Sequence, residues 1–352
     1  MKNIVKISIA IILLTSGELS AQVSHFSQFY STPTTIAPSF TGMTGGGTRL
    51  SLNYRDQWPK IPGVFTTFAI ALDHDFTRAN SGIGIFVFRD QAGSGKLGST
   101  DLGALYSYKI KMAENRGYKK GEWFMRPGIY FRYTNRSIVF EELTFGDQYS
   151  LLPDGTIQFM KGKTIEATPL KKKGYIDFAS SLIAYNELYW GGFTVDHLLE
   201  PDQSLTGSSA TIPVKLSIFG GAKLLLVQKK RRSQYGVEPE SVTFTMHYRL
   251  QGKYDQLDLG AYWSQDPFTL GAWFRGIPVF DADNRKYGSI DAIIVLVGLK
   301  VSESIKIGYS YDITISKLLG HTGGSHEVSL VYGFNKNLNE KRRRGIIPCP
   351  SF

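Results

Sequence analysis

Two histidines and a carboxylate near the C-terminus come closest, in type and spacing, to a metal site. His321 and His326 are five residues apart, and Glu327 follows the second histidine. Imidazole and carboxylate groups bind Zn²⁺, but a zinc-binding helix carries the pattern HExxH, which this sequence lacks. Both rings would meet only if the loop folded back on itself. We therefore expect a loop histidine and a strand-end histidine rather than a metal site.

An acidic triplet and a glycine-rich stretch also resemble chemical motifs. In Asp73-His74-Asp75 two carboxylates surround a histidine, but successive residues of a strand point to opposite faces, so we expect a hydrated cluster at a turn. The segment DQAGSGKLGST (90–100) lacks the GxxxxGK[ST] order of a phosphate loop, and we expect a hairpin loop. The sequence also lacks a GxSxG nucleophile elbow. We therefore predict no enzyme, no cofactor and no metal.

The composition narrows the class of protein. Of the 352 residues, 13% are aromatic and only 20% are charged, which is an unusual balance for a soluble enzyme. The single cysteine, Cys349, excludes an internal disulfide and a cysteine-rich metal cluster. The net charge of +10 would suit a nucleic-acid partner only if the basic residues clustered on one surface.

Residues 1–21 have the features of a cleaved signal peptide. Lys2 and Lys6 accompany an apolar stretch over 7–14, and Ala21 precedes the expected cleavage near Gln22. The apolar stretch is too short to span a bilayer as a mature helix. We expect export from the cytoplasm, which argues against a nucleic-acid partner.

Alternation of apolar and polar residues is the main pattern of the mature chain. In SIKIGYSYDITIS (304–316), isoleucines and tyrosines share one face of a strand. Similar segments predict about fourteen strands, many of them long for a soluble sheet and suited to a tilted crossing of a bilayer. The predicted strands are 48–55, 64–74, 82–90, 99–112, 122–135, 175–186, 187–196, 213–228, 241–252, 255–265, 267–277, 288–301, 304–316 and 325–334.

Two architectures fit these strands, a soluble sandwich or propeller and a closed antiparallel membrane barrel. Export, strand length and aromatic residues near strand ends favour an all-β transmembrane barrel over 48–335. An even barrel with both termini in the periplasm directs the longest connection, 136–174, outward. Residues 336–352 then form a periplasmic tail.

The N-terminal segment 22–47 is polar, contains two prolines and ends in glycines. We predict that it packs inside or beneath the barrel, and the alternative is a disordered leader. The predicted aromatic anchors are Phe26, Phe29, Tyr30 and Phe40.

Other candidate partner-binding residues lie in an outer loop, in the last hairpin and in the tail. Trp58 lies in a proline-containing loop, where it serves either an aromatic girdle or a partner. Asp312 and Glu327 point into the lumen near the outer rim, where they stabilise the closing seam or touch a bound partner. The tail candidates are Arg342, Arg343, Arg344 and Cys349, and the alternative for them is a disordered extension.

Three stretches of the chain resemble the PorP/SprF-like outer-membrane proteins of the type IX secretion system and gliding machinery of Bacteroidetes. They are FSQFYSTPTTIAPSFTG (26–42) leading into LNYRDQWPKIPGVFTTFAIALD (52–73), the hairpin YDITISKL…GGSHEVSLVYGF, and the tail RRRGIIPCPSF (342–352). They bracket nearly the whole mature chain, while the middle, about 90–290, matches only in general barrel character.

This resemblance implies an outer-membrane barrel that performs no chemistry. Some members of such a family link the secretion machinery to periplasmic components, and others bind the C-terminal domain of a secreted cargo or adhesin for export or surface anchoring. We expect partners of these two kinds and outer-membrane lipid, without nucleic acid or a small-molecule substrate. The alternatives are a general diffusion porin and an exported enzyme of the outer membrane.

Overall fold

The computed structural model describes the following residues: 25–45, 47–114, 122–152, 156–160, 164–165, 170–226, 239–276, 290–315 and 320–334. The predicted signal peptide 1–21 and the predicted tail 336–352 lie outside them, and so do the tail residues Arg342, Arg343, Arg344 and Cys349.

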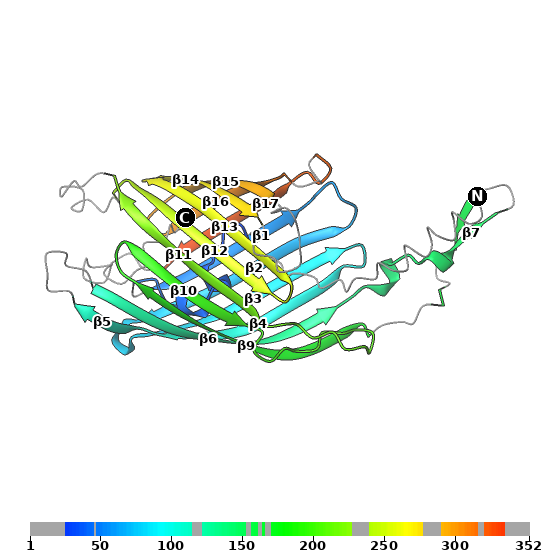
Figure 1. Cartoon of the computed structure of the whole chain (residues 1–352), viewed down its shortest axis with the longest axis horizontal. Coiled ribbons are helices and arrows are strands. Elements are labelled where there is room, and N and C mark those ends of the chain that lie inside the picture. Colours follow the sequence, from blue (N-terminus) through cyan, green and yellow to red (C-terminus); the bar gives the residue numbers. More distant parts are fainter. Residues whose placement is uncertain are drawn as a thin grey trace.

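A closed antiparallel barrel with 14 strand positions forms the fold (Figure 1). The first strand, β1 (Thr48–Gln57), pairs with the last, β17 (Ser325–Gly333). The strand β4 (Leu97–Tyr108) pairs with β6 (Glu122–Ser137). The short strand β5 (Ile110–Glu114) follows β4 in the sequence and also pairs with β6, so that β4 and β5 together fill one strand position. The other barrel strands are β2 (Val64–Phe76), β3 (Ser81–Gly93), β9 (Lys172–Tyr185), β10 (Tyr189–Asp196), β11 (Lys215–Leu225), β12 (Ser241–Gln251), β13 (Tyr254–Gln265), β14 (Phe268–Gly276), β15 (Ile290–Lys300) and β16 (Ile305–Thr314).

The structure confirms the predicted transmembrane barrel, and each predicted strand matches a strand position with small shifts at its ends. The segment predicted as 304–316, for example, is β16, which ends at Thr314. The expected hairpin loop at 90–100 is also present, as the tight turn between β3 and β4.

The two faces of the barrel differ as a bilayer requires. In β15 the outward residues Ile293, Val295 and Val297 are 41%, 47% and 45% exposed, whereas the inward Ile294 and Leu296 are buried. Elsewhere the inner face is largely polar. Its buried polar side chains include Ser51, Asn53, Arg126, Thr134, Ser181, Thr243, Ser310 and Ser329. No helix among the described residues is long and apolar enough to cross a membrane.

The two ends of the barrel carry different connections. We call the end with the β1–β2, β3–β4, β6–β9, β10–β11, β12–β13 and β16–β17 connections the loop end, and the opposite end, where β1 begins and β17 ends, the turn end. The β6–β9 connection is the longest and contains a two-stranded sheet of β7 (Tyr149–Leu151) and β8 (Ile157–Phe159) that the sequence did not predict. Figure 1 shows β7 well beyond the barrel. We call this connection the arm.

Residues 25–45, here called the lumenal segment, run through the barrel from the loop end to the turn end. Near the loop end, the backbone N–H of Ser27 donates to Glu327 of β17 at 2.7 Å. Further down, the N–H of Ser39 donates to Ser181 Oγ of β9 at 2.8 Å, and near the turn end the N–H of Gly42 donates to Asp73 of β2. Two short 3-10 helices, η1 (Pro33–Thr35) and η2 (Pro38–Phe40), shape the middle of the path, and each begins at a proline whose φ is already suited to a helical turn.

Glycines in the wall allow the lumenal segment to approach closely. A Cβ at Gly128 of β6 would collide with the backbone of Pro38 and Ser39. A Cβ at Gly82 of β3 would collide with the carbonyl oxygen of Thr41. Both positions require glycine, because any other residue would place a side chain where the strand backbone meets the backbone of the lumenal segment.

The acidic triplet at 73–75 differs from the expected hydrated cluster. Asp73 and Asp75 both face the lumen and are only 1% and 7% exposed. The Asp73 carboxylate accepts hydrogen bonds from Arg49 at 2.9 Å as well as from the lumenal segment. The expectation was wrong because it placed these residues at a turn, whereas β2 continues to Phe76 and keeps the two carboxylates on its inner face.

Candidate functional site

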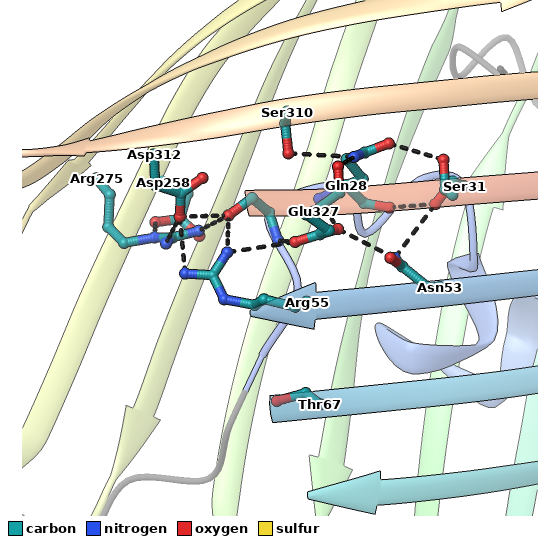
Figure 2. A network of polar contacts seen from close by, with 12 residues as sticks. Gln28, Ser31, Asn53, Arg55, Thr67, Asp258, Arg275, Ser310, Asp312 and Glu327 are labelled. Atoms are coloured by element: carbon teal, nitrogen blue, oxygen red, sulfur yellow. Dashed lines mark hydrogen bonds and ion pairs between the residues drawn. The ribbon is translucent and has the colours of Figure 1, made fainter. Parts of the chain in front are cut away.

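Glu327 is the point where the lumenal segment meets the closing seam of the barrel (Figure 2). Its carboxylate accepts hydrogen bonds from the backbone N–H groups of Ser27 and Gln28 at 2.7 and 2.8 Å. The side-chain amide of Asn53, on β1, donates to the same carboxylate at 3.0 Å. Glu327 is fully buried on β17, so one side chain joins the first strand, the last strand and the lumenal segment.

Buried arginines neutralise the carboxylates around Glu327. Arg55 of β1 donates to Asp312 of β16 at 2.8 Å and to Glu327 at 3.3 Å. Arg275 of β14 donates to Asp312 at 2.9 Å and to Asp258 of β13 at 3.2 Å (Figure 2). We call these five residues the seam cluster. Burial raises the strength of each ion pair and also the cost of leaving one charge alone, so the cluster stabilises the seam only as a complete set.

The predicted aromatic anchors lie inside the barrel. The Phe29 ring is 4.9 Å from Trp273 and 4.5 Å from Tyr30, and the Phe40 ring is 5.4 Å from Phe219. Phe26 belongs to a second apolar cluster, where its ring lies 6.0 Å from Phe88. The four anchors are between 1% and 4% exposed. The lumen therefore contains an apolar core like that of a soluble protein.

The remaining predicted residues do not join this site. Trp58 is half-buried at the loop end, where its ring packs against Phe65 at 5.8 Å and its backbone N–H donates to the carbonyl oxygen of Gly324. His321 is exposed. His326 lies on the opposite face of β17 from Glu327 and contacts the Tyr309 hydroxyl at 2.8 Å. His326 and Glu327 thus point apart and do not form a metal site.

A second cluster of buried charged residues was not predicted from the sequence. Arg132 of β6 places its Nη2 atom 2.6 Å from Asp177 of β9, 2.6 Å from Asp196 of β10 and 2.8 Å from the His197 ring. The aspartate and histidine atoms lie within 4.8 Å of one another, as the ligands of a cation would. The guanidinium takes that central place, so the group cross-links three strands. No local sequence motif predicts this cluster, because only the strand register brings its residues together.

The β10–β11 connection lies at the loop end, where Asp202 fixes its conformation. Its carboxylate accepts hydrogen bonds from Lys173 at 2.6 Å and from the N–H groups of Ala210 and Ser204 at 2.9 and 3.0 Å. These donors favour the ionised form and lower the pKa of Asp202 to about 2. The connection is thereby held in a defined conformation at neutral pH.

A closed barrel with an apolar outer face and a lumen filled by its own N-terminal segment defines the class of plugged transmembrane β-barrels. A family model described as "Type IX secretion system membrane protein PorP/SprF" matches residues 18–332. The chain belongs to this family. The match spans the middle of the chain as well as the two hairpin regions in which the resemblance was seen, and it ends before the tail 342–352.

The solved structures that match this chain include the following three, each at low overall similarity. The chain is 10% identical to a KdgM porin, with a TM-score of 0.35 and coverage of 82% of this chain and 99% of the porin. It is 7% identical to the Acinetobacter baumannii outer membrane protein Omp33, with a TM-score of 0.37 and coverage of 83% and 98%. It is 6% identical to CdiB from Acinetobacter baumannii, with a TM-score of 0.39 and coverage of 82% and 60%. No curated protein matches the sequence.

Proposed function

We propose that this protein is a non-enzymatic, plugged outer-membrane barrel of the type IX secretion system that binds the C-terminal domain of a secreted cargo or adhesin, for export or for anchoring at the cell surface. The observation that carries the proposal is the filled lumen. Residues 25–45 cross it from end to end and share its apolar core with the barrel wall.

The filled lumen argues against a general diffusion porin. A porin keeps a water-filled channel, whereas here the rings of Phe29, Tyr30 and Phe40 occupy the space between opposite walls. The buried charges of the seam cluster bind one another and the lumenal segment, so they do not line a path for ions. Family membership and this closed interior together favour a protein that binds other proteins.

The arm is the surface that best suits a partner. Ile157 and Phe159 of β8 are 71% and 43% exposed, and Ile165 is 93% exposed. A two-stranded sheet of three residues per strand has little stability alone in water, so added contacts to a partner would stabilise it. We infer that the loop end, which carries the arm, faces outward, because outer-membrane barrels place their longer loops on that side.

Recovery of partners from native outer membranes tests this function. A tagged wild-type protein is expected to recover a secreted type IX cargo, and the double variant Ile157→Ser, Phe159→Ser is expected to lose most of it. A matched control, Val295→Ala on the lipid-facing side of β15, should retain the cargo. Recovery of secretion-machinery proteins alone would favour the other family role, a link to periplasmic components. Recovery of neither class would contradict the proposal.

A further inference from the structure

Strand β8 of the arm has one unpaired edge within the described part of the chain. It pairs with β7 on one side, where the backbone N–H of Met160 donates to the carbonyl oxygen of Gln148 at 2.8 Å. Backbone groups alternate in direction along an antiparallel strand, so the positions one and three residues before Met160 point the other way. The N–H and C=O groups of Ile157 and Phe159 therefore face away from β7.

The open edge of β8 is accessible and lacks the usual protection. Each of its three residues is exposed, and Ile157 is 71% exposed, whereas Gln148 on the β7 side is buried. Natural sheets protect such edges with charged side chains, proline or a covering segment. The β8 residues Ile-Gln-Phe (157–159) include no charge and no proline. The edge is therefore suited to pairing with another strand.

The side chains around this edge define which strand would fit. Ile157 and Phe159 lie on one face of the two-stranded sheet, where the Tyr149 ring is 5.2 Å from the Phe159 ring. Gln158 lies on the opposite face with Ser150. A strand added to β8 would bring two of its side chains to the apolar face and the one between them to the polar face. A segment with the order apolar, polar, apolar meets both requirements.

We propose that β8 accepts an extended segment of the secreted partner as an antiparallel strand, with apolar side chains beside Ile157 and Phe159 and a polar side chain beside Gln158. This inference rests on the proposed function, in which the arm contacts a secreted protein. Antiparallel pairing is the more stable arrangement, and β7 and β8 already use it. A second copy of the chain would offer only its own three-residue β8, which buries far less than the roughly 1,000 Å² of a stable interface.

Fluorescence anisotropy of a small peptide tests the inference on the purified barrel in detergent. The probe is Thr-Val-Thr-Val-Thr with a fluorescent dye at its N-terminus. In the proposed pairing the valine N–H groups point to β8 and the threonine N–H groups point away. N-methylation of both valines is expected to weaken binding about tenfold, because two backbone hydrogen bonds are lost, whereas N-methylation of the threonines should leave binding unchanged. No binding of the parent peptide, equal effects of the two methylations or the reverse order would overturn the proposal.

Two substitutions at one position separate the backbone from the side chain. Ile157→Pro and Ile157→Ala both remove the exposed isoleucine, but only proline removes the N–H group at the open edge. That N–H points away from β7, so proline leaves the β7–β8 pairing intact. Ile157→Pro is expected to bind the peptide about threefold to tenfold more weakly than Ile157→Ala. Equal affinities would contradict the assigned edge. If the arm of the proline variant fails to form, the methylated peptides still test the edge on the wild-type protein.

Cargo recovery from native membranes distinguishes this inference from the proposed function. Lower recovery with Ile157→Pro than with Ile157→Ala is the expected result, and equal recovery would contradict strand pairing with the secreted partner. Absence of cargo even with the wild-type protein would contradict the proposed function alone, because the peptide assay contains no secreted protein. A dimer of the purified barrel that Ile157→Pro dissociates would assign β8 to a second copy and would overturn the proposal.

Discussion

Replacement of Glu327 with alanine is expected to destabilise the barrel more than any other single change in the seam cluster. The carboxylate is fully buried and accepts from two backbone N–H groups of the lumenal segment, from Asn53 and from Arg55. Alanine leaves these donors without their shared acceptor and removes one of the three carboxylates of the cluster. A buried donor left without its acceptor costs about 1–3 kcal/mol of unfolding free energy, and the Ser27 and Gln28 N–H groups and the Asn53 amide all lose theirs, so we expect a loss of about 3–5 kcal/mol.

Two comparisons separate the ion pair from loss of side-chain volume. Glu327→Gln keeps the shape and one carbonyl acceptor, and Arg55 keeps Asp312, so we expect a loss of about 1–3 kcal/mol. Val328→Ala, on the lipid-facing side of the same strand, provides a control for truncation alone. A double variant with Arg55→Ala should lose less than the sum of the single losses, because the two residues are in contact.

Urea unfolding of the purified barrel in lipid vesicles measures these losses, and the temperature at which the folded gel band disappears gives an independent ranking. Recovery of partners is measured separately in the same variants, since a seam role changes stability without a specific loss of binding. An unfolding free energy of Glu327→Ala within about 0.5 kcal/mol of the wild type would refute the role given to this carboxylate.

Three further predictions follow from the lumen. Phe29→Ala should lower the unfolding free energy by about 3–5 kcal/mol in the same urea assay, because the ring is enclosed by aromatic neighbours; a loss under about 1 kcal/mol would contradict this packing. Gly128→Val should lower the unfolding free energy by about 1–3 kcal/mol or more, since its side chain would collide with the backbone of the lumenal segment. The smaller side chain of Gly128→Ala should lower it less. Arg132→Ala should let added Zn²⁺ raise the unfolding temperature, because Asp177 and Asp196 lose their guanidinium, whereas the wild type should not respond. An equal effect of Zn²⁺ on the variant and the wild type would contradict the conclusion that the Arg132 guanidinium occupies the position of a cation.

Alternation made the barrel predictable from the sequence. In β16 the polar and apolar residues alternate along the strand because lipid faces one side and the lumen the other. The period of this alternation, the length of the strands and their number therefore all predicted a transmembrane barrel. The aromatic residues of the lumenal segment were predictable for a different reason, since apolar rings in an exported polar segment need an apolar surrounding.

Contacts between distant strands were not predictable in the same way. Arg132 and Asp177 are 45 positions apart, and only the pairing of β6 with β9 places them together. Gly128 looks like an ordinary strand glycine until the path of the lumenal segment is known. The arm sheet, β7 with β8, was missed because each strand has only three residues, too few for a period to show.

Conductance of the purified protein in a planar lipid bilayer tests the central claim, a barrel filled by its own N-terminal segment, most directly. We predict that the wild-type protein inserts without a steady open-channel current over a wide range of voltage and salt. As a positive control, a porin of known conductance should show stepwise current under the same conditions. A stable, ohmic current from the wild-type protein would contradict the filled lumen and would favour the diffusion porin instead.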